Sequence, residues 1–368
     1  MFFKSVKFYL VCVGILSSMS TLAVERHRSF YEASRALAMG DAFTAYGQGF
    51  ESVYYNPAGV ARRTSPQLKY FDMELGGSYS LVSYIRGNLT SFYSLKELGT
   101  QLAASQPDTL TGLFFGFTPQ FLAKNFSIGM VVKSSFDAIV DGTTADLNIF
   151  STSDLALYLH YGVSLFGGVV KFGVGAKALD RAELDRTYTT GEYSTGAISF
   201  SSQWKEGIGY GVDAGVLITS PTAGLPTLGI AVQDIGATTL RDRRVLWTGS
   251  KGTPGAPPRL EQRINVGGSI TTKHDAGLKS VFSVEVKDLE RFVDNMSLEH
   301  WHAGWELNVN DIVRLRAGVN QGIYWTAGLG IQFVGFALDL STWGENLYAF
   351  TGQKRELRYY VGKYTLAF

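Results

Sequence analysis

The sequence predicts an all-β protein, an antiparallel transmembrane β-barrel of about fourteen strands with an N-terminal plug in its lumen. Three observations predict this fold. Runs of about nine to fourteen residues alternate between apolar and polar side chains. The links between these runs are alternately long and short, and the last run ends on an aromatic residue, Phe368. The chain also holds 42 glycines in 368 residues, which suits strands with close backbone contacts.

The first residues, 1–23, are predicted to be a secretory signal peptide. Lys4 and Lys7 precede an apolar run at residues 8–16, and a small-residue cleavage site follows. This run is too short for a membrane-spanning helix, which needs about 20 apolar residues. The single cysteine, Cys12, lies within it, so we expect a mature chain without disulfides.

The charge balance argues against a nucleic acid partner. The whole chain carries 33 basic and 32 acidic residues, and the signal peptide accounts for two of the basic ones. A near-neutral chain lacks the excess of basic surface that binds a phosphate backbone. We therefore expect no nucleic acid among the partners.

Fourteen runs are predicted as barrel strands, since their lengths suit strands that cross a bilayer at a tilt. In the run at 208–218, Tyr210 and Val212 share one face, and Gly211 and Asp213 share the other. Alternation alone is equally typical of a soluble β-sandwich. The predicted strands are residues 66–75, 112–121, 127–138, 152–166, 168–181, 206–219, 226–234, 261–273, 278–288, 298–308, 312–320, 323–333, 335–343 and 357–368.

The lengths of the links favour a membrane barrel over a sandwich. Outer-membrane barrels place long loops on one side and tight turns on the other, whereas a sandwich has no reason to sort them. Tight turns are predicted at Gly167 and Gly335, for example, and one short exception near Asn320 falls among the long links. The long links are residues 76–111, 139–151, 182–205, 235–260, 289–297 and 344–356. The first of them holds a predicted amphipathic helix at residues 91–104.

The last strand adds an independent signal. Tyr360, Tyr364 and Phe368 lie on one apolar face of this strand, where the sequence ends. This pattern resembles the C-terminal assembly signature of bacterial outer-membrane proteins. The last strand is expected to pair with the first, because an unpaired edge in lipid leaves backbone groups without hydrogen bonds.

Residues 24–62 are the predicted plug, and residues 63–368 are the predicted barrel. Within the plug, small residues alternate with apolar and aromatic ones from 33 to 61. Pro57 fixes its own φ and extends Asn56, so the chain must turn there. With its AMG-x-AF core and its NPAG end, this stretch resembles the plug, or hatch, of FadL-type outer-membrane transporters and of the related PorV-type proteins.

The resemblance implies passive uptake of a hydrophobic small molecule, a long-chain fatty acid or an aromatic hydrocarbon, across the outer membrane of a Gram-negative bacterium. An apolar pocket in the plug would receive it. The residues expected to line this pocket are Phe43, Tyr46, Phe50, Tyr54 and Tyr55. The residues that match the NPA motif are Asn56, Pro57 and Ala58. These three either take part in a gate or form a structural turn that anchors the plug to the wall.

A PorV-type role is the alternative that the sequence leaves open. Such a barrel docks secreted proteins or components of a secretion machine and transports nothing. The charged loops at 182–205 and 235–260 slightly favour surface contact with protein or lipopolysaccharide. A general porin is a third reading, against which the plug-like stretch counts. We expect a monomer surrounded by outer-membrane lipid and lipopolysaccharide.

The inward faces are expected to carry charges of both signs that pair with one another, because a basic side chain facing mid-bilayer costs about 2–4 kcal/mol. His300 and His302 are two residues apart, but Glu306 lies too far along the strand to complete a metal site with them. No GxSxG or Walker motif occurs. We therefore expect no enzyme activity, no cofactor and no metal. Aromatic side chains are expected to face the lipid at Tyr161, Tyr210, Trp301, Trp305, Trp325 and Phe333.

Overall fold

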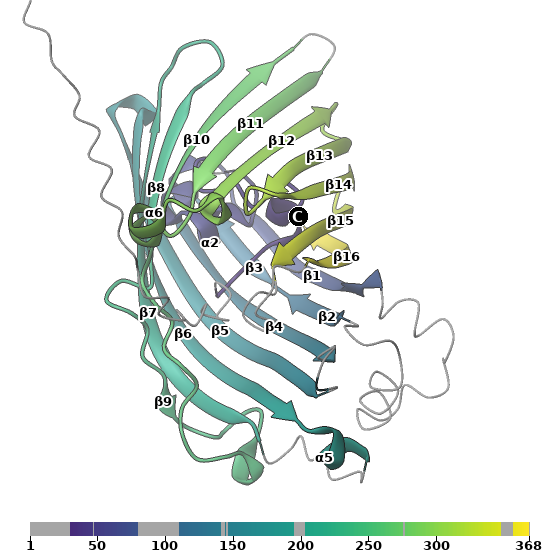
Figure 1. The fold of residues 1–368 in the computed structure, drawn as a ribbon. Coiled ribbons are helices and arrows are strands. Elements are labelled where there is room, and N and C mark those ends of the chain that lie inside the picture. The colour runs from purple at the N-terminus through teal and green to yellow at the C-terminus, as the bar shows by residue number, and fades with distance from the viewer. Residues whose placement is uncertain are drawn as a thin grey trace, which may run out of the picture.

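The structure, a computed structural model, describes residues 30–46, 48–79, 110–140, 144, 146–194, 203–274, 277–346 and 356–367. The predicted signal peptide, the predicted helix at 91–104 and the terminal Phe368 lie outside these residues. Within them, the strands form one antiparallel sheet that closes on itself, because β16 pairs with β1 (Figure 1). The predicted pairing of the last strand with the first is confirmed.

Sixteen strands take part in this sheet. Their bounds are β1 (Gln67–Ser78), β2 (Leu110–Phe117), β3 (Gln120–Ala123), β4 (Phe126–Val140), β5 (Leu147–Leu165), β6 (Val170–Tyr188), β7 (Lys205–Thr219), β8 (Thr227–Gln233), β9 (Arg241–Asp242), β10 (Arg263–Lys273), β11 (Leu278–Val286), β12 (Trp301–Val309), β13 (Val313–Asn320), β14 (Tyr324–Phe333), β15 (Phe336–Asn346) and β16 (Glu356–Ala367).

The wall of the barrel has fourteen strands, as predicted. β2 and β3 both pair with β1 on one side and β4 on the other, so they form one wall strand, interrupted at Thr118 and Pro119. A proline lacks the N–H that a ladder needs, which explains the interruption. β9 is a two-residue addition to β7 rather than a wall strand.

The prediction placed the outer part of β6 in a loop, and this was wrong. Residues 182–188, which carry Glu183 and Asp185, belong to β6, which runs for 19 residues beside the equally long β5. The period-two pattern fades there because charged residues stand on both faces of the strand. On β6, Arg181 forms two hydrogen bonds with Asp154 of β5, at 2.7 and 2.8 Å.

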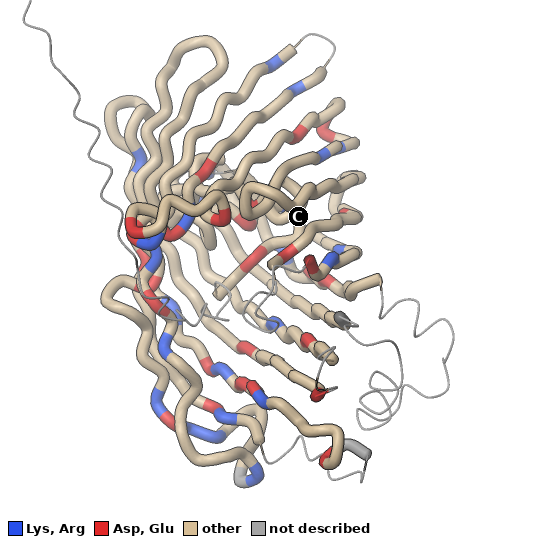
Figure 2. Tube along the Cα trace, viewed as in Figure 1, with Lys and Arg blue, Asp and Glu red and all other residues tan. Residues whose placement is uncertain are grey.

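The face of each side chain follows the predicted alternation. All six aromatic residues predicted to face outward are exposed, Tyr210 the most at 78%. On β16, Tyr360 and Tyr364 are exposed, whereas Tyr359 and Val361 are buried. Figure 2 shows basic and acidic residues interleaved along the strands rather than separated into regions.

The helices in the described part of the chain are all short. They are α1 (Ser34–Leu37), α2 (Ser52–Tyr55), η1 (Pro57–Arg62), η2 (Phe166–Gly168), α5 (Thr190–Ser194), η3 (Gly249–Lys251), α6 (Leu289–Asn295) and η4 (Leu298–His300). No helix in the described ranges is long and apolar enough to cross a membrane.

Residues 30–63, here called the N-terminal segment, lie inside the ring of strands (Figure 1). Their buried side chains include Met39 and Phe43, both without exposed surface. The segment contacts opposite sides of the wall: Gly40 donates a hydrogen bond to Thr326 of β14, whereas Asn56 donates to carbonyls of β7 and β8. The strands join at two ends. The short-turn end includes the links at 124–125 and 334–335, and the long-loop end includes those at 189–204 and 234–262.

From the sequence, bends or bulges are expected at three glycine pairs, residues 76–77, 167–168 and 267–268. Gly167 and Gly168 do form a turn, with φ of 65° and 96°. Gly267 instead sits in regular pairing between Gly229 of β8 and Glu285 of β11, and Gly76 pairs regularly with Val361 of β16. A Cβ at Gly76 would overlap the carbonyl oxygen of Tyr360, and one at Gly267 would lie 3.2 Å from that of Val284. Glycine suits both positions because neighbouring backbone comes close.

Candidate functional site: the N-terminal segment in the lumen

Inward-facing glycines on β12 and β13 seat the first part of the segment. Any Cβ at Gly304 would overlap the carbonyl oxygen of Met39, and one at Gly318 would lie 2.5 Å from the backbone nitrogen of Gly40. The backbone of residues 39–40 therefore rests directly on the backbone of the wall. Only glycine allows this approach, because real Cβ atoms never come so close to backbone atoms.

A second set of inward-facing glycines seats the later part of the segment on β6, β7 and β8. A Cβ at Gly173 would overlap Pro57, one at Gly215 would overlap the side chain of Asn56, and one at Gly229 would lie 2.6 Å from the carbonyl oxygen of Thr44. The wall is thus bare of side chains at two places, and the segment's backbone fills both.

The Asn56-Pro57-Ala58 motif lies at the second seat. The Asn56 amide donates to the carbonyl oxygens of Thr44 and Val216, both at 3.1 Å, and of Ile230 at 3.3 Å. Its Oδ1 accepts from the Ala58 N–H at 3.0 Å, which caps η1, with Pro57 at the first position of that helix. Proline suits this position because its missing N–H would have no helical partner there.

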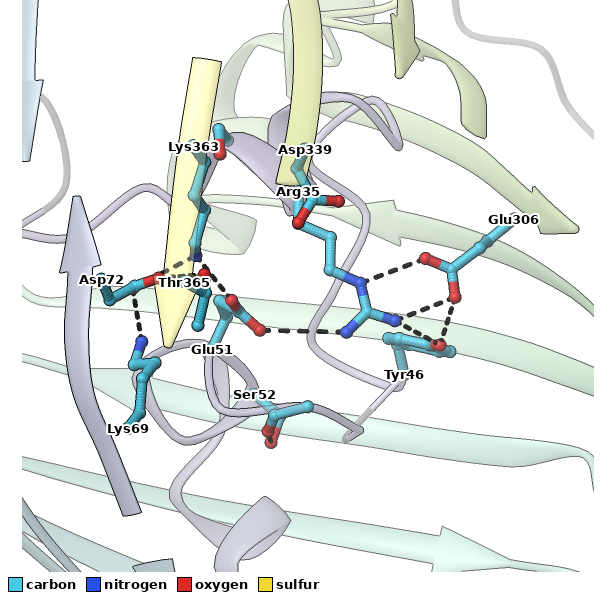
Figure 3. Close-up of polar contacts among 12 residues, drawn as sticks. Arg35, Tyr46, Glu51, Ser52, Lys69, Asp72, Glu306, Asp339, Lys363 and Thr365 are labelled. Carbon is cyan, nitrogen blue, oxygen red and sulfur yellow. Dashed lines mark hydrogen bonds and ion pairs between the residues drawn. The ribbon is translucent and has the colours of Figure 1, made fainter. Parts of the chain in front are cut away.

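Arg35 of α1 is the centre of one group of charges. Its guanidinium forms two hydrogen bonds with Glu306 of β12, at 2.9 and 3.1 Å, and one with the Tyr46 hydroxyl at 2.9 Å. Glu306 in turn accepts from Arg316, which also pairs with Asp339 at 2.6 Å. Arg35 is thereby tied to β12 directly, as Figure 3 shows, and to β13 and β15 through Arg316 and Asp339.

Glu51 is the centre of a second group of charges on the other side of the segment. It accepts from Lys363 of β16 at 2.7 Å and lies 3.8 Å from Arg35, so it joins the two groups (Figure 3). Lys363 also lies 3.3 Å from Asp72, which pairs with Lys69 at 2.6 Å. Burial opposes ionisation of Glu51, but Lys363, Lys69 and Arg35 outweigh it and hold the pKa of this carboxyl well below its usual value.

The prediction that inward charges pair with one another is therefore confirmed, and the segment joins in the pairing. Glu285 of β11 accepts from the N–H groups of Phe43 and Thr44, at 2.7 and 2.8 Å. His302 hydrogen-bonds through Nδ1 to the carbonyl oxygen of Gly40 at 2.8 Å, whereas His300 lies in η4. The two histidines are thus separated in role, and His302 is a structural partner of the segment.

The five aromatic residues predicted to line a pocket fall into three groups. Phe43 packs against Tyr46 and Tyr55, with ring centroids 4.8 and 5.2 Å apart. Tyr54 instead packs between Tyr31 and Tyr158, beside a small polar cavity of about 10 Å³, room for one water. Among the described residues these aromatic side chains do not line one common cavity.

Phe50, the fifth of these aromatic residues, stands apart from the other four. With Tyr46 it lines a cavity of 270 Å³ that lies between the N-terminal segment and the short-turn end of the barrel. The Arg63 guanidinium and the Lys69 ammonium lie over its ring, at 5.7 and 5.3 Å from the centroid. These cations place positive charge beside the aromatic ring of Phe50.

An apolar cluster that the sequence reasoning missed lies on the inward faces toward the long-loop end. Trp343 of β15 stacks on Tyr359 of β16 with 5.4 Å between ring centroids, and Phe114 of β2 meets Trp343 edge-on. The cluster consists of Leu37, Phe114, Ile139, Trp343, Leu357, Tyr359 and Val361. Strand parity was the available signal, since these wall residues share the inward face with the charges nearer the short-turn end.

Comparison with solved structures finds the same fold in membrane channels. The monoaromatic hydrocarbon channel CymD matches with a TM-score of 0.53 and 10% identity over 90% of this chain and 96% of that one. The toluene transporter TodX of P. putida gives 0.52 and 11%, and the toluene transporter TbuX of Ralstonia pickettii gives 0.50 and 11%, each over 90% of this chain and 97% of the other.

The comparisons by sequence add no relative. No family model matches the chain, and no curated protein does. At 10–11% identity the structural likeness is one of fold, and it extends over nearly the whole length of both chains. The chain therefore has the fourteen-stranded barrel fold of the hydrocarbon channels.

Proposed function

We propose that the protein is an outer-membrane channel for the passive uptake of a hydrophobic small molecule. The observation that carries this proposal is the apolar cluster around Trp343 and Tyr359, inside a barrel whose other inward residues are largely polar. These side chains are packed against one another and against Leu37 of the N-terminal segment, so a shift of the segment would open an apolar surface to an apolar ligand. The likeness in fold to proteins described as hydrocarbon channels and toluene transporters supports the same reading.

The N-terminal segment acts in this proposal as a plug that stands between the apolar cluster and the short-turn end. Leu37 of the segment belongs to the cluster itself, so a molecule held there touches the plug. Passage requires the segment to shift. Asn56, Pro57 and Ala58 serve as its fixed anchor, because their contacts are with the wall, whereas Phe43, Tyr46, Tyr54 and Tyr55 rearrange as the segment moves.

The long loop between β8 and β10 supports placement of this end of the barrel at the outer surface. Glu206 of β7 accepts hydrogen bonds from the N–H groups of residues 245–248, at 2.7 to 3.2 Å, and so fixes the tip of the loop. Residues 241–247 are all exposed, and they combine three arginines with Val245, Leu246 and Trp247. We infer that this tip contacts the phosphates and acyl chains of lipopolysaccharide.

Substituting Glu206 by Gln tests the loop's role. The loss of the charged acceptor loosens the tip, and we expect binding of purified protein to lipopolysaccharide micelles to weaken about three- to tenfold. Glu192→Gln, at a half-exposed carboxylate of this end that pairs with Arg186, serves as the control. Equal binding by both variants contradicts the inference about the loop and leaves the channel proposal untouched.

Replacing Trp343 by Ala tests the channel proposal directly. Loss of a buried tryptophan from the binding surface removes a few kcal/mol of contact, so toluene or fatty acid uptake into proteoliposomes should fall about tenfold or more. Trp325→Ala, at an outward tryptophan that is 55% exposed, is the matched control and should transport normally if it folds. Heat-modifiable gel migration verifies that both variants form the barrel.

Two results contradict the channel proposal. One is wild-type protein in which neither compound class crosses faster than through protein-free vesicles. The other is normal uptake by Trp343→Ala. A barrel that transports nothing but retains a secreted protein would instead favour the docking role of PorV-type proteins. No step of the proposal involves catalysis, a cofactor or a metal.

A further inference from the structure

The proposed uptake function does not involve the cavity of 270 Å³ at the short-turn end. This cavity lies between residues 46–51 of the N-terminal segment and the ends of β11 to β16, and its rim includes the turn at Gly335 and the start of β1 at Gln67. It is therefore on the exit side of the plug. Its volume is near the lower end of the range for small-molecule sites, about 300–1,000 Å³.

The cavity walls carry more basic than acidic side chains. The basic ones are Arg35, Arg63, Lys69, Lys279 and Arg314, and the acidic ones are Glu51, Asp311 and Asp339. Four of the eight are held in ion pairs described above: Arg35 with Glu306, Lys69 with Asp72, Glu51 with Lys363 and Asp339 with Arg316.

The remaining basic side chains, Arg63, Lys279 and Arg314, are opposed only by Asp311 among the lining residues. The carboxylate of Asp311 accepts from Asn308 at 2.8 Å. Lys279 donates to the neutral amide of Gln48 at 2.7 Å, and Arg63 donates to that of Gln67 at 2.8 Å. Among the described residues, the cavity therefore keeps more positive charge than the neighbouring carboxylates neutralise.

Two of these guanidinium groups also have buried N–H groups without a partner in the described structure. They are Nη2 of Arg63 and Nε of Arg314. A buried donor without an acceptor costs about 1–3 kcal/mol, and more when it is charged, so an anion in the cavity would recover this energy. Burial lowers the pKa of Arg63, and the attraction of Glu51 does not make up for it.

Lys279 and Arg314 stand in one inward row. Lys279 of β11 pairs with Asn308 of β12, and Asn308 pairs with Arg314 of β13, so the two cations are two strands apart, about 10 Å between backbones. Their long side chains can converge on one carboxylate from this distance. Phe50 and Phe336 line the same cavity and offer apolar surface next to the charge.

We propose that this cavity binds the carboxylate of a small amphiphilic acid, with the cations on the anion and the aromatic rings on its apolar body. The site deepens the proposed uptake function, on which it rests: a hydrophobic acid that passes the plug is received here before release. The volume suits a molecule of about 10–12 non-hydrogen atoms, or the head of a longer one. Neutral hydrocarbons gain nothing from it.

The test compares three probes with one apolar skeleton and different charge. Calorimetry on the purified full chain in a neutral detergent measures binding of 4-phenylbutyrate, 4-phenylbutanol and 4-phenylbutylamine. We expect the acid to bind about tenfold or more tightly than the alcohol, and the amine more weakly than either. Acetate should bind at least tenfold more weakly than the acid, because it lacks the ring.

Variants then assign the site. In Lys279→Gln and Arg314→Gln, the preference for the acid over the alcohol should fall about five- to tenfold, while alcohol binding stays within about twofold. Lys273→Gln, at an exposed lysine that ends β10 and does not line the cavity, is the matched control. Arg314→Lys should recover most of the preference, because it restores the charge.

Equal binding of acid, alcohol and amine by the wild-type protein overturns the inference without any variant having to fold. An unchanged preference in both glutamine variants does the same. If acetate binds as tightly as 4-phenylbutyrate, the cavity is a plain anion site, and the proposal that it recognises an amphiphilic acid is wrong. If the acid binds here but no hydrophobic compound is transported into proteoliposomes, the anion site stands and the uptake function fails, so the two failures are distinguishable.

Discussion

The two halves of the lumen differ in chemistry although the same strands line both. On β16 the inward residues toward the long-loop end are Leu357, Tyr359 and Val361, whereas the next two along the same face are Lys363 and Thr365. Among the described residues, Leu37 is the one member of the N-terminal segment in the apolar cluster. The polar half holds the segment by ion pairs and by glycine seats.

Under the proposed function, this difference would let one wall both receive an apolar molecule and hold a plug. The parity of a residue decides whether its side chain faces the lumen or the outside. Its position along the strand decides whether it lies in the apolar or the polar half of the lumen. The segment also packs on apolar wall residues such as Leu122 and Leu179, but its ion pairs and close backbone contacts are ones that an apolar ligand cannot replace. Removing the polar grip should therefore free the plug and leave the apolar half intact.

The largest effect is expected from filling the first glycine seat. Gly304→Val combined with Gly318→Val places side chains where the backbone of residues 39–40 now lies, and overpacking at two sites costs about 2–6 kcal/mol. The barrel itself should form, since valine suits strands. Planar-bilayer conductance should rise sharply as the segment leaves its seat.

The control for this prediction is Gly268→Val, at an outward glycine of β10 with nothing within 4 Å of an added Cβ. It should conduct like wild type. If the double variant remains closed and its segment resists protease as before, the segment is not held by the close backbone approach.

Sequence reasoning predicted the fold well for a physical reason. In lipid, each wall strand must keep one apolar face over its whole bilayer-crossing length, so the fourteen strands and their faces follow from period two. β6 extends beyond the bilayer-crossing length, and there its outward face need not be apolar. The predicted strand therefore ended near Arg181, whereas β6 continues to Tyr188. The interruption at Pro119 was likewise absorbed into one predicted strand, 112–121.

The site was less predictable because it depends on residues far apart in the chain. Nothing near Gly304 or Gly215 in sequence shows that a segment over 100 residues away will rest on them. Arg35 was overlooked because its partner, Glu306, is 271 positions distant. The aromatic residues of the segment, by contrast, were visible locally, and their prediction as pocket residues stays a prediction.

A smaller effect is expected from Arg35→Met. The substitution removes a buried guanidinium from Glu306, Tyr46 and Glu51 and should weaken seating of the segment by about 3 kcal/mol. Limited proteolysis of the segment in the folded barrel measures this as faster cleavage. Arg259→Met removes an exposed pair with Glu261. It should change the free energy of releasing the segment, which the cleavage rate reports, by less than about 1 kcal/mol. Similar cleavage of both variants would contradict a role for the charges.

The smallest effect, about 1–2 kcal/mol, is expected from Asn56→Ala, which removes the donor to the carbonyls of Val216 and Ile230. Asn56→Asp should be worse, because it keeps the cap on Ala58 but turns a carboxylate oxygen toward those carbonyls. If Asn56 is an anchor, protease protection of the segment falls in the order wild type, Ala, Asp, and uptake changes only in step with it. Asn148→Ala, at a half-buried asparagine that accepts a hydrogen bond from Thr187, is the control. Uptake lost while protection stays at the wild-type level would make Asn56 part of the gate, and the fixed point of the plug would then have to lie elsewhere, at the first glycine seat.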